Sequence, residues 1–523
     1  MIEEWNNINH PKHLKMDANP ILPPPYEYDL VIIGGGINGV AIARDASLRG
    51  LKTILFEKQD FGSGASTKSS KLIHGGLRYL EHLDFWLVKE SLEERSILTH
   101  IAPYHVKPLS FVLPVYKNNS RPSWMIKLGL HLYDFFCPNG DFPKHTSWSS
   151  SQIALEFPEL IKEDLTGGFE YYDAQMQDNR LVIENLLSAE KAGAQAFNYH
   201  EVVSFIYDND RIQGVNYRNT ITGKVGSVRA KAVVNATGAW SGDHLLTHEL
   251  SPTKGVHLIV PLIHDTHALI LSAPQDKRVF FIMPWNGYSL IGTTDTPFSG
   301  NPGEANVSKE DISYLLEAVN YYFPKLEYTP ETVIASFAGV RPLVRSLHTE
   351  ASAISRKPLL QENSNGLFVL AGGKFTIFRK MAEETVDLIV HKHFSDYPLK
   401  ACSTAEISLY SDSFTEEEIR KKCVFLSLTD SLSNHLLQTY GPGAMHILNS
   451  LENYPEMKEQ ICPNHPHVAA ELYHAINREK ANTPEDWFYR RSSIAYTQCP
   501  SLKCYEKVAS FFKSFSLKTV DKK

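Results

Sequence analysis

The sequence has little of what marks several large classes of protein. Its six cysteines, among 523 residues, are scattered without CxxC pairs or the histidine spacing of a zinc site. This pattern indicates free thiols in a reducing compartment and predicts no metal site. The formal net charge of -7 gives a nucleic acid no electrostatic support. We therefore expect neither a metal nor a nucleic-acid partner.

The chain also lacks long apolar runs. No stretch reaches the roughly 18 apolar residues of a transmembrane helix. The N-terminus carries Glu3, Glu4 and Asp17 and has no apolar segment typical of a secretory signal. These absences predict a chain that stays in the cytoplasm and does not span a bilayer, although they leave open that it lies on one.

What is present is the composition of a folded globular protein, with 43% hydrophobic and 21% charged residues. A chain of this length is expected to form two or three domains. Residues 1–27, which end close to three consecutive prolines, are expected to be an N-terminal extension.

The clearest motif is a GxGxxG sequence between an apolar strand and a helix. It consists of Gly34, Gly36 and Gly39, directly after the apolar residues 28–33. Such a turn cradles a nucleotide pyrophosphate on the helix N-terminus. A second strand at residues 53–57 ends in Glu57, 18 residues after Gly39, where a ribose-binding carboxylate belongs. The unit predicts a dinucleotide with an unphosphorylated adenosine ribose.

Further pieces of this domain recur far along the chain. Residues 228–240 form a strand that ends in Ala236-Thr237-Gly238, and residues 367–371 form a strand followed by Gly372-Gly373-Lys374 and a helix over about 376–390. Between them, alternating apolar runs in residues 251–334 predict an antiparallel sheet. After residue 397, amphipathic segments such as 416–428 and 468–478 predict a separate helical domain.

These patterns divide the chain into three domains. A discontinuous nucleotide-binding domain is expected over residues 28–110, 170–250 and 335–396. A substrate domain with a membrane-facing segment is expected over residues 111–169 and 251–334, and a helical domain over residues 397–523.

One loop is unusually dense in small polar and basic residues. Residues 62–79 include the run Ser-Ser-Lys-Leu-Ile-His-Gly-Gly-Leu-Arg-Tyr at 69–79. Hydroxyls, backbone N–H groups and cations of this kind suit a bound anion. The residues alone leave open a solvated serine-rich loop.

With these residues the sequence resembles the FAD-dependent, quinone-linked glycerol-3-phosphate dehydrogenases. The resemblance covers nearly the whole chain and becomes looser at residues 477–481 and 487–491. Its motifs are residues 32–39, 69–81, 168–171, 235–238, 284–285, 291–295, 339–343 and 372–374. The run at 69–79 is highly specific, whereas GxGxxG alone fits many nucleotide enzymes.

The resemblance implies an α/β fold of the amino-acid oxidase type, with an FAD-binding Rossmann-like domain, an antiparallel-sheet substrate domain and a C-terminal helical domain. It implies that sn-glycerol 3-phosphate is oxidised to dihydroxyacetone phosphate by hydride transfer to FAD, with electrons passed to membrane quinone. The alternatives are an oxidase that uses oxygen and a catalytically silent flavin-bearing membrane scaffold. The oligomeric state stays open, a homodimer included.

The resemblance also names site residues. Arginine suits a phosphate dianion because its planar fork matches the phosphate oxygens. The residues expected to bind substrate are Arg78, Tyr79, Arg341, Arg356 and His74, and those expected to take part in catalysis are His257, Arg341 and Lys374. The residues expected to bind FAD are Gly34, Gly35, Gly36, Asn38, Gly39, Glu57, Ser69, Ser70, Lys71, Gly75, Gly76, Ala236, Thr237, Gly238, Gly373, Lys374 and Thr376.

Three of these residues have distinct expected roles. His257 is expected to be the general base, with His74 as a competing base or a flavin contact. Lys374 is expected to place a cation near the substrate or the flavin pyrimidine ring. The residues alone leave open that Arg341 is a salt-bridged surface arginine and that His257 is a satisfied sheet histidine.

The sequence departs from the family pattern in two places. Phe375-Thr-Ile-Phe378 stands where the family has an aliphatic or aromatic residue, two small polar residues and a tyrosine. Thr376 remains, while one hydroxyl position and the tyrosine hydroxyl are lost. Lys254-Gly255-Val256 replaces a more polar turn before His257.

Quinone reduction without a transmembrane helix requires an interfacial surface, and two stretches could supply it. Residues 121–136 carry Trp124, Leu128, Leu132 and Phe135 at helical spacing and resemble the family's membrane-facing segment. The tail carries Val508, Phe511, Phe512 and Phe515 on one helical face, although ordinary core packing is the favoured reading there. A peripheral location on the cytoplasmic side of the inner membrane is expected.

Overall fold

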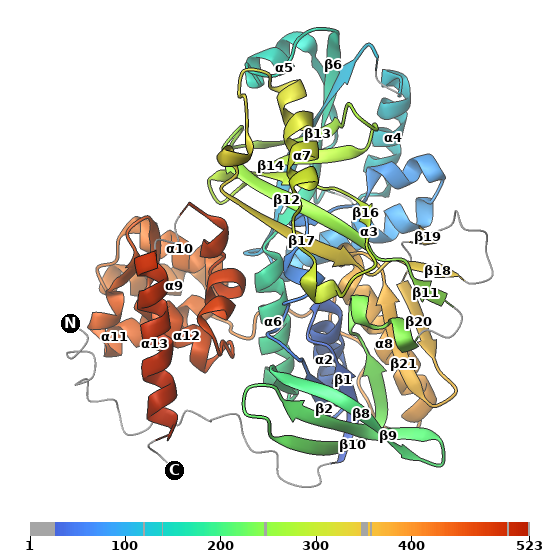
Figure 1. The fold of residues 1–523 in the computed structure, drawn as a ribbon, viewed down its shortest axis with the longest axis vertical. Coiled ribbons are helices and arrows are strands. Elements are labelled where there is room, and N and C mark those ends of the chain that lie inside the picture. The colour runs from blue at the N-terminus through green and yellow to red at the C-terminus, as the bar shows by residue number, and fades with distance from the viewer. Residues whose placement is uncertain are drawn as a thin grey trace.

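The computed structural model describes residues 27–118, 121–138, 140–244, 248–346, 354–355, 358–498 and 502–520. The expected extension, apart from Glu27, lies outside these residues. Figure 1 shows three regions: a lower sheet with its helices, an upper sheet, and a group of helices in red to one side.

The lower region is built on an eight-stranded sheet with the order β20-β21-β10-β1-β2-β7, to which β9 and β8 are added at β10. Its strands are β1 (Glu27–Ile33), β2 (Thr53–Phe56), β7 (Gln195–Phe197), β8 (His200–Asp208), β9 (Arg211–Asn219), β10 (Val225–Asn235), β20 (Pro358–Glu362) and β21 (Leu367–Gly372). The five strands from β7 to β21 pair in parallel. Parallel strands that are buried on both faces need near-continuous apolar runs, and the sequences of β1 and β2 are of this kind.

Three helices complete this region: α2 (Ile37–Arg49), α6 (Asp178–Lys191) and α8 (Phe378–His393). α2 packs against both α6 and α8, so even its polar residues Arg44 and Asp45 are buried. The short helix η7 (Phe375–Ile377) leads into α8, close to the predicted start of the last helix.

The upper region is a ten-stranded sheet with the order β16-β12-β15-β14-β13-β4-β6-β3, with β17 paired to β12 and β5 to β6. Its strands are β3 (Leu72–Ile73), β4 (Val106–Tyr116), β5 (Thr146–Ser149), β6 (Leu165–Met176), β12 (Thr253–Pro261), β13 (His267–Ser272), β14 (Val279–Trp285), β15 (Tyr288–Gly292), β16 (Thr296–Pro297) and β17 (Ala335–Arg341). The helices of this region are α3 (Phe85–Ile101), α4 (Ser123–Phe136), α5 (Ser150–Glu156) and α7 (Lys309–Tyr322). A small sheet of β11 (His248–Leu250), β18 (Val344–Ser346) and β19 (Ile354–Ser355) is separate.

The upper sheet is antiparallel apart from the β13–β4 pair. β4 and β6 pair along their whole length, from Val106 opposite Met176 to Tyr116 opposite Leu165. The expected domain boundaries after residues 110 and 169 therefore fall inside two strands of this sheet.

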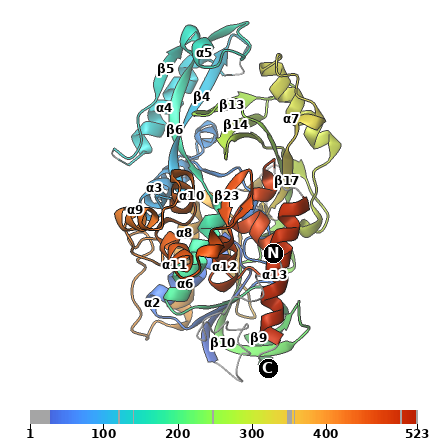
Figure 2. The ribbon, with the colours of Figure 1, turned by 90° about the vertical axis from the view of Figure 1, so that its left-hand side faces the viewer.

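The third region is helical. It contains α9 (Glu416–Phe425), α10 (Asp430–Tyr440), α11 (Ala444–Asn453), α12 (Ala469–Asn477), α13 (Leu502–Val520), the π-helix η10 (Asp486–Arg491) and the hairpin β22 (Gln460–Cys462)–β23 (His465–Val468). Figure 2 shows it in front of α6. Its own core includes Val508 and Phe512 of the tail, with Phe511 packed against it, whereas the side chain of Phe515 lies outside the described residues.

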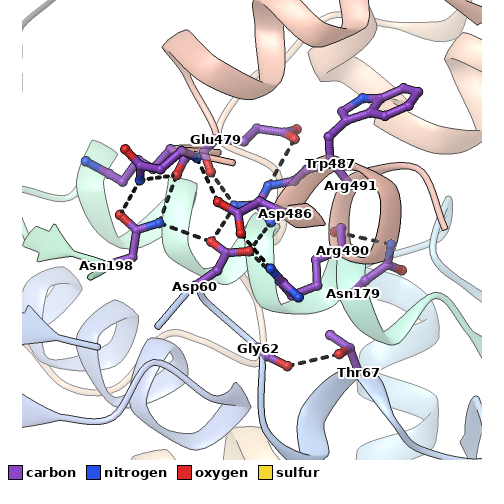
Figure 3. Close-up of polar contacts among 12 residues, drawn as sticks. Asp60, Gly62, Thr67, Asn179, Asn198, Glu479, Asp486, Trp487, Arg490 and Arg491 are labelled. Atoms are coloured by element: carbon purple, nitrogen blue, oxygen red, sulfur yellow. Dashed lines mark hydrogen bonds and ion pairs between the residues drawn. The ribbon is translucent and has the colours of Figure 1, made fainter. Parts of the chain in front are cut away.

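A buried ion-pair network joins the helical region to the lower sheet (Figure 3). Asp60, which follows β2, is 1% exposed. Its carboxylate accepts hydrogen bonds from Arg491 at 2.9 and 3.0 Å and from Arg490 at 2.5 Å. Burial alone would raise the pKa of Asp60, but Arg491 and Arg490 hold it below its ordinary value. A second link pairs Arg180 of α6 with Glu479 at 2.8 Å.

We expect Asp60→Asn to destabilise the protein. The substitution keeps the shape of the side chain but removes the carboxylate that Arg490 and Arg491 share, so that Asp486 and Glu479 are the buried carboxylates left beside the two guanidinium groups. Breaking a buried pair in this way costs about 3–5 kcal/mol. The midpoint of urea unfolding, followed by circular dichroism, should fall clearly. Glu417→Gln, which breaks an exposed pair with Lys421, should leave that midpoint unchanged. Equal midpoints for Asp60→Asn and the parent chain would contradict the expectation.

Candidate functional site

A cavity of about 1460 Å³ lies where the three regions meet. Its walls come from the β1–α2 turn, the loop after β2, the ends of β10 and β21, strands β12 and β17, and the helical region around η10. Typical ligand pockets measure roughly 300–1,000 Å³. The cavity therefore has room for a large cofactor and a small substrate together.

The β1–α2 turn forms one end of this cavity through close backbone contacts. Gly34 has φ +103°, and a Cβ there would lie 2.8 Å from the carbonyl oxygen of Ala236. A Cβ at Gly39 would lie 1.8 Å from the carbonyl oxygen of Gly34. At Gly36, by contrast, the one nearby atom is Ser66 Oγ at 3.1 Å, and this residue lines the cavity. Gly34 and Gly39 thus allow close backbone packing, and Gly36 faces the ligand site, as expected for the three glycines of a dinucleotide-binding turn.

The N-terminus of α2 faces the same cavity, and Gly36, Ile37 and Asn38 line it. The N–H groups of a first helical turn lack partners within the helix and attract phosphate. The backbone N–H of Ile37 donates to Ser66 Oγ at 2.9 Å. Ser66 is a site residue that the sequence reading did not single out, because it is one of several serines in the polar loop.

Glu57 lies where the ribose-binding acid was expected. Its carboxylate accepts hydrogen bonds from the backbone of Gly35 at 2.7 Å and of Gln59 at 2.8 Å. Burial raises its pKa above the ordinary value. Each carboxylate oxygen can accept a further hydrogen bond, and Glu57 lines the cavity, so the geometry fits a ribose diol.

The residues of the Ser69–Lys71 segment have two roles: some line the cavity, and one stabilises the backbone behind it. Ser69 and Ser70 line the cavity, whereas Lys71 does not. Lys71 Nζ is buried against Asp178, 2.7 Å from its carboxylate, and Ser69 Oγ donates to the same carboxylate at 2.7 Å. The structure therefore places Lys71 behind the loop, where it fixes the backbone.

His257 lies on β12, at 1% exposure, and lines the cavity. Its Nε2 is 2.8 Å from Ser70 Oγ, and its ring stacks on Phe337 with centroids 5.0 Å apart. Its Nδ1 is buried without a hydrogen-bond partner among the described residues. Burial, followed by the charges of Arg341 and Lys71, holds the pKa of His257 well below its ordinary 6.5. This environment favours the neutral imidazole, which has one unprotonated ring nitrogen, and it also makes His257 a weaker base than an ordinary histidine.

Arg341 ends β17 with its guanidinium at the cavity wall. It donates to Thr293 Oγ1 at 2.8 Å and to Asp295 at 3.1 Å, and it stays 31% exposed. A Cβ at Gly255 would lie 2.3 Å from Arg341 Nη2. The guanidinium therefore occupies space that a side chain at residue 255 would fill. Gly255 belongs to the Lys254–Val256 segment, where the sequence departs from the family pattern.

Lys374 and Tyr79 lie together on the wall, with Lys374 Nζ 3.7 Å from the centre of the Tyr79 ring. Thr376 Oγ1 lies 3.2 Å from both the backbone nitrogen and the carbonyl oxygen of His74. This bridge ties the η7 segment to the polar loop. His74 lines the cavity as well.

The remaining expected residues fall into three groups. Those on the cavity wall are Ala236, Thr237, Gly238 and Gly373. Those off the wall, in the layer behind it, are Gly35, Gly39, Gly75 and Gly76. Arg78 belongs to the short helix η2 (Leu77–His82), but its side chain, like all of Arg356, lies outside the described residues.

The Phe375–Phe378 departure has a structural explanation. Ile377 and Phe378 are 1% exposed and belong to the core of the lower region. Phe375 packs against that core and lines the cavity. The apolar residues thus strengthen packing, while Thr376 keeps its polar bridge.

The helical region contributes wall residues that the motifs did not predict. Tyr489, Arg490 and Tyr496 line the cavity, more than 400 residues after the glycine turn. The only sequence signal was the looser family resemblance at residues 487–491.

Comparisons with known proteins agree with this geometry. A family model described as FAD dependent oxidoreductase matches residues 29–388, and one described as the C-terminal domain of alpha-glycerophosphate oxidase matches residues 402–516. A glycerol-3-phosphate dehydrogenase from Synechocystis sp. is 37% identical over 90% of this chain and 89% of its own. An aerobic glycerol-3-phosphate dehydrogenase from Staphylococcus saprophyticus is 33% identical, over 92% and 89%.

Two solved structures complete the comparison. The glycerol-3-phosphate dehydrogenase from Bacillus halodurans complexed with FAD has a TM-score of 0.73 and 29% identity, with 94% of each chain covered. An L-alpha-glycerophosphate oxidase from Mycoplasma pneumoniae with FAD bound has a TM-score of 0.58 at 16% identity and covers 75% of this chain and all of its own. The latter likeness concerns the fold alone.

We expect Gly39→Ala to abolish FAD retention, because the added Cβ would meet the Gly34 carbonyl and push α2 away from the turn. The ratio of flavin absorbance to protein absorbance in the purified chain measures this loss. Gly443→Ala, where a Cβ meets nothing within 4 Å, is the control and should keep the parent ratio. A Gly39→Ala protein with full flavin content would contradict the assignment.

Proposed function

Because this chain belongs to the family of FAD dependent oxidoreductases, we propose that it oxidises sn-glycerol 3-phosphate to dihydroxyacetone phosphate and passes the electrons to membrane quinone. FAD is the cofactor of the family, and when bound it accepts the hydride from the substrate carbon. The glycine turn, the α2 N-terminus and Glu57 would hold its adenosine diphosphate part.

One observation carries the choice of substrate. Two cationic side chains, Arg341 and Lys374, line the same cavity as the neutral His257. A dianionic phosphate ester needs cations, and oxidation of an alcohol needs a base for its proton. Similarity over nearly the full length to chains named glycerol-3-phosphate dehydrogenase supports the same substrate.

The residues divide the work as follows. Thr293, Thr294 and Asp295 orient the Arg341 guanidinium through both of its terminal nitrogens, and its remaining N–H groups bind phosphate oxygens. Lys374 supplies a second positive charge beside Tyr79. The hydroxyl proton passes to His257, and Ser70, which lines the same cavity 2.8 Å from the imidazole Nε2, can relay it.

The decisive experiment is anaerobic stopped-flow absorbance of the flavin. Glycerol 3-phosphate should bleach the oxidised band, and plain glycerol should not, because it lacks the phosphate that Arg341 binds. Reoxidation is then followed with a soluble quinone and, separately, with oxygen. Fast reoxidation by oxygen and slow reoxidation by quinone would favour the oxidase alternative. A flavin that neither compound bleaches would favour the silent scaffold and overturn the proposal.

Two variants separate binding from chemistry in this assay. Arg341→Lys should raise the substrate Kd by about tenfold or more, since lysine keeps the charge but loses the planar fork, and a hydrogen bond to a charged group contributes roughly 1.5–3 kcal/mol. His257→Gln should lower the limiting reduction rate by about 100-fold with little change in Kd. Arg218→Lys, at an exposed pair with Glu201, is the control. Unchanged kinetics in either site variant would remove that residue from its role.

Membrane association is supported by an apolar patch on α3 and α4, two helices that contact each other. No helix within the described residues is long and apolar enough to cross a bilayer. Trp86 and Trp124 are 73% and 66% exposed. The α3–α4 patch consists of Leu83, Phe85, Trp86, Trp124, Met125, Leu128 and Phe135. Monomeric surfaces rarely gather so many large apolar side chains, and Trp suits a lipid interface.

The α3–α4 patch is larger than the membrane-facing segment expected at residues 121–136, and it is a better candidate for the membrane surface than the C-terminal tail. Its first three residues precede or begin α3, and the sequence reading did not mark them. Lys89 lies beside the patch, with its Nζ 5.7 Å from the centre of the Trp86 ring and 3.7 Å from the Glu93 carboxylate. Of the tail residues expected on one helical face, Val508 and Phe512 are buried in the helical region and are therefore not available to a membrane.

We expect the double variant Trp86→Ser/Trp124→Ser to lose binding to vesicles that contain anionic phospholipid. Removal of two large apolar anchors should weaken binding at least about tenfold. Co-sedimentation with vesicles measures the bound fraction. Val424→Ser/Phe425→Ser, which removes two exposed apolar residues of α9, is the matched control. Equal binding by the two double variants would exclude the α3–α4 patch as the membrane surface.

A further inference from the structure

A histidine and glutamate cluster in the helical region lies outside the large cavity. His435 of α10, His467 of β23 and Glu471 of α12 place one ligand atom each within 4.8 Å of one another. Glu471 Oε1 is 2.8 Å from His435 Nε2 and 2.9 Å from His467 Nδ1. Three separate elements thus converge on one carboxylate oxygen.

The charge of this cluster is not balanced by a permanent cation. Glu471 is 0% exposed, yet among the described residues no lysine or arginine forms an ion pair with it. Its other contacts are the Tyr440 hydroxyl at 3.0 Å and the Val468 backbone N–H at 2.7 Å. The groups around this buried carboxylate are polar, but none of them carries a permanent positive charge, and a buried negative charge is stabilised by a positive partner.

The surroundings orient the three groups as a metal site requires. The Val468 N–H bonds Glu471 Oε2 and fixes the plane of the carboxylate, which turns Oε1 toward the histidines. Thr439 Oγ1 lies 3.4 Å from His435 Nδ1, so that nitrogen can carry the proton and leave Nε2 with its lone pair. Such outer hydrogen bonds set the tautomer of metal-binding histidines.

A second cavity, of about 180 Å³, borders the cluster and leaves room for a further ligand. His435 and His467 line it, together with His465. Its basic wall residues Lys71, Arg180 and Arg491 are neutralised by Asp178, Glu479 and Asp60 respectively. A cation at Glu471 would therefore not face an unpaired positive charge from these residues.

We propose that His435, His467 and Glu471 bind one divalent transition-metal ion, with Zn²⁺ as the best fit and water from the small cavity as the fourth ligand. Two imidazoles and a carboxylate are a usual zinc donor set. Zinc ligands about 2.0 Å from the ion stand roughly 3.3 Å apart, so the present 2.8 and 2.9 Å contacts need to open only slightly. The ion would cross-link α10, β23 and α12. The sequence reading expected no metal because the scattered cysteines lack the spacing of a zinc site, and the 32 residues between His435 and His467 form no local motif.

The test uses the full chain with its flavin, dialysed first against a chelator and then against Zn²⁺ or Co²⁺. We expect one Zn²⁺ per chain by elemental analysis, a higher thermal midpoint than in the metal-free chain, and the intense visible bands of tetrahedral Co²⁺. His435→Gln and Glu471→Gln should each lose the ion and the Co²⁺ bands. Flavin content and circular dichroism confirm that the variants are folded.

His264→Gln is the matched control, because His264 also pairs with a glutamate, Glu156, at 3.2 Å, outside the proposed site. It should keep the full metal content. Parent protein that binds no Zn²⁺, gives no tetrahedral Co²⁺ bands, or loses metal equally in His264→Gln would overturn the proposal. If the two site variants do not fold, the Co²⁺ spectrum and the metal-to-protein ratio of the parent chain are sufficient to test the proposal. None of these readouts depends on the proposed substrate.

Discussion

The close approach of three backbone segments at the β1–α2 turn is the constraint on which the site depends. The Gly34 carbonyl is in the way of any side chain at Gly39, and Ala236 is in the way of any side chain at Gly34. The same contacts hold β10 beside β1 and bring the start of α2 to the end of the sheet. Phosphate binding by a helix N-terminus works only at short range, so the small residues position the cofactor by allowing this packing.

Much of this could be read from the sequence because it is local. The strand, turn, helix and acid of the first unit lie within about 30 residues, and each has its own residue signature. The strand at 367–372 and the helix after it were recognisable for the same reason. The sheet order was not, because pairing of β4 with β6 or of β1 with β10 joins segments with no common local pattern.

The sequence also could not predict which side chains of the polar loop face the cavity and which pack behind it. Lys71 and Ser70 are neighbours in one specific motif, yet Ser70 faces His257 and Lys71 faces Asp178. The partner Asp178 lies 107 residues away, and the positive φ of Lys71 turns the chain between the two directions. A motif therefore marked the right loop without telling which side chains touch the ligand. The same holds for Tyr489 and Arg490, which reach the cavity only because the helical region docks against α6.

Buried carboxylates organise that docking, and they follow one electrostatic rule. Asp60, Asp178 and Glu479 are all almost fully buried, and each is neutralised by an arginine or a lysine from another part of the chain. Burial of a charge is tolerated only with such a partner. Glu471 is equally buried and sits beside the same interface, but the groups around its carboxylate are histidines, a tyrosine hydroxyl and a backbone N–H. The positive charge beside Glu471 comes either from protonated histidine or from a bound cation, and the donor set of two imidazoles and a carboxylate fits the proposed metal ion.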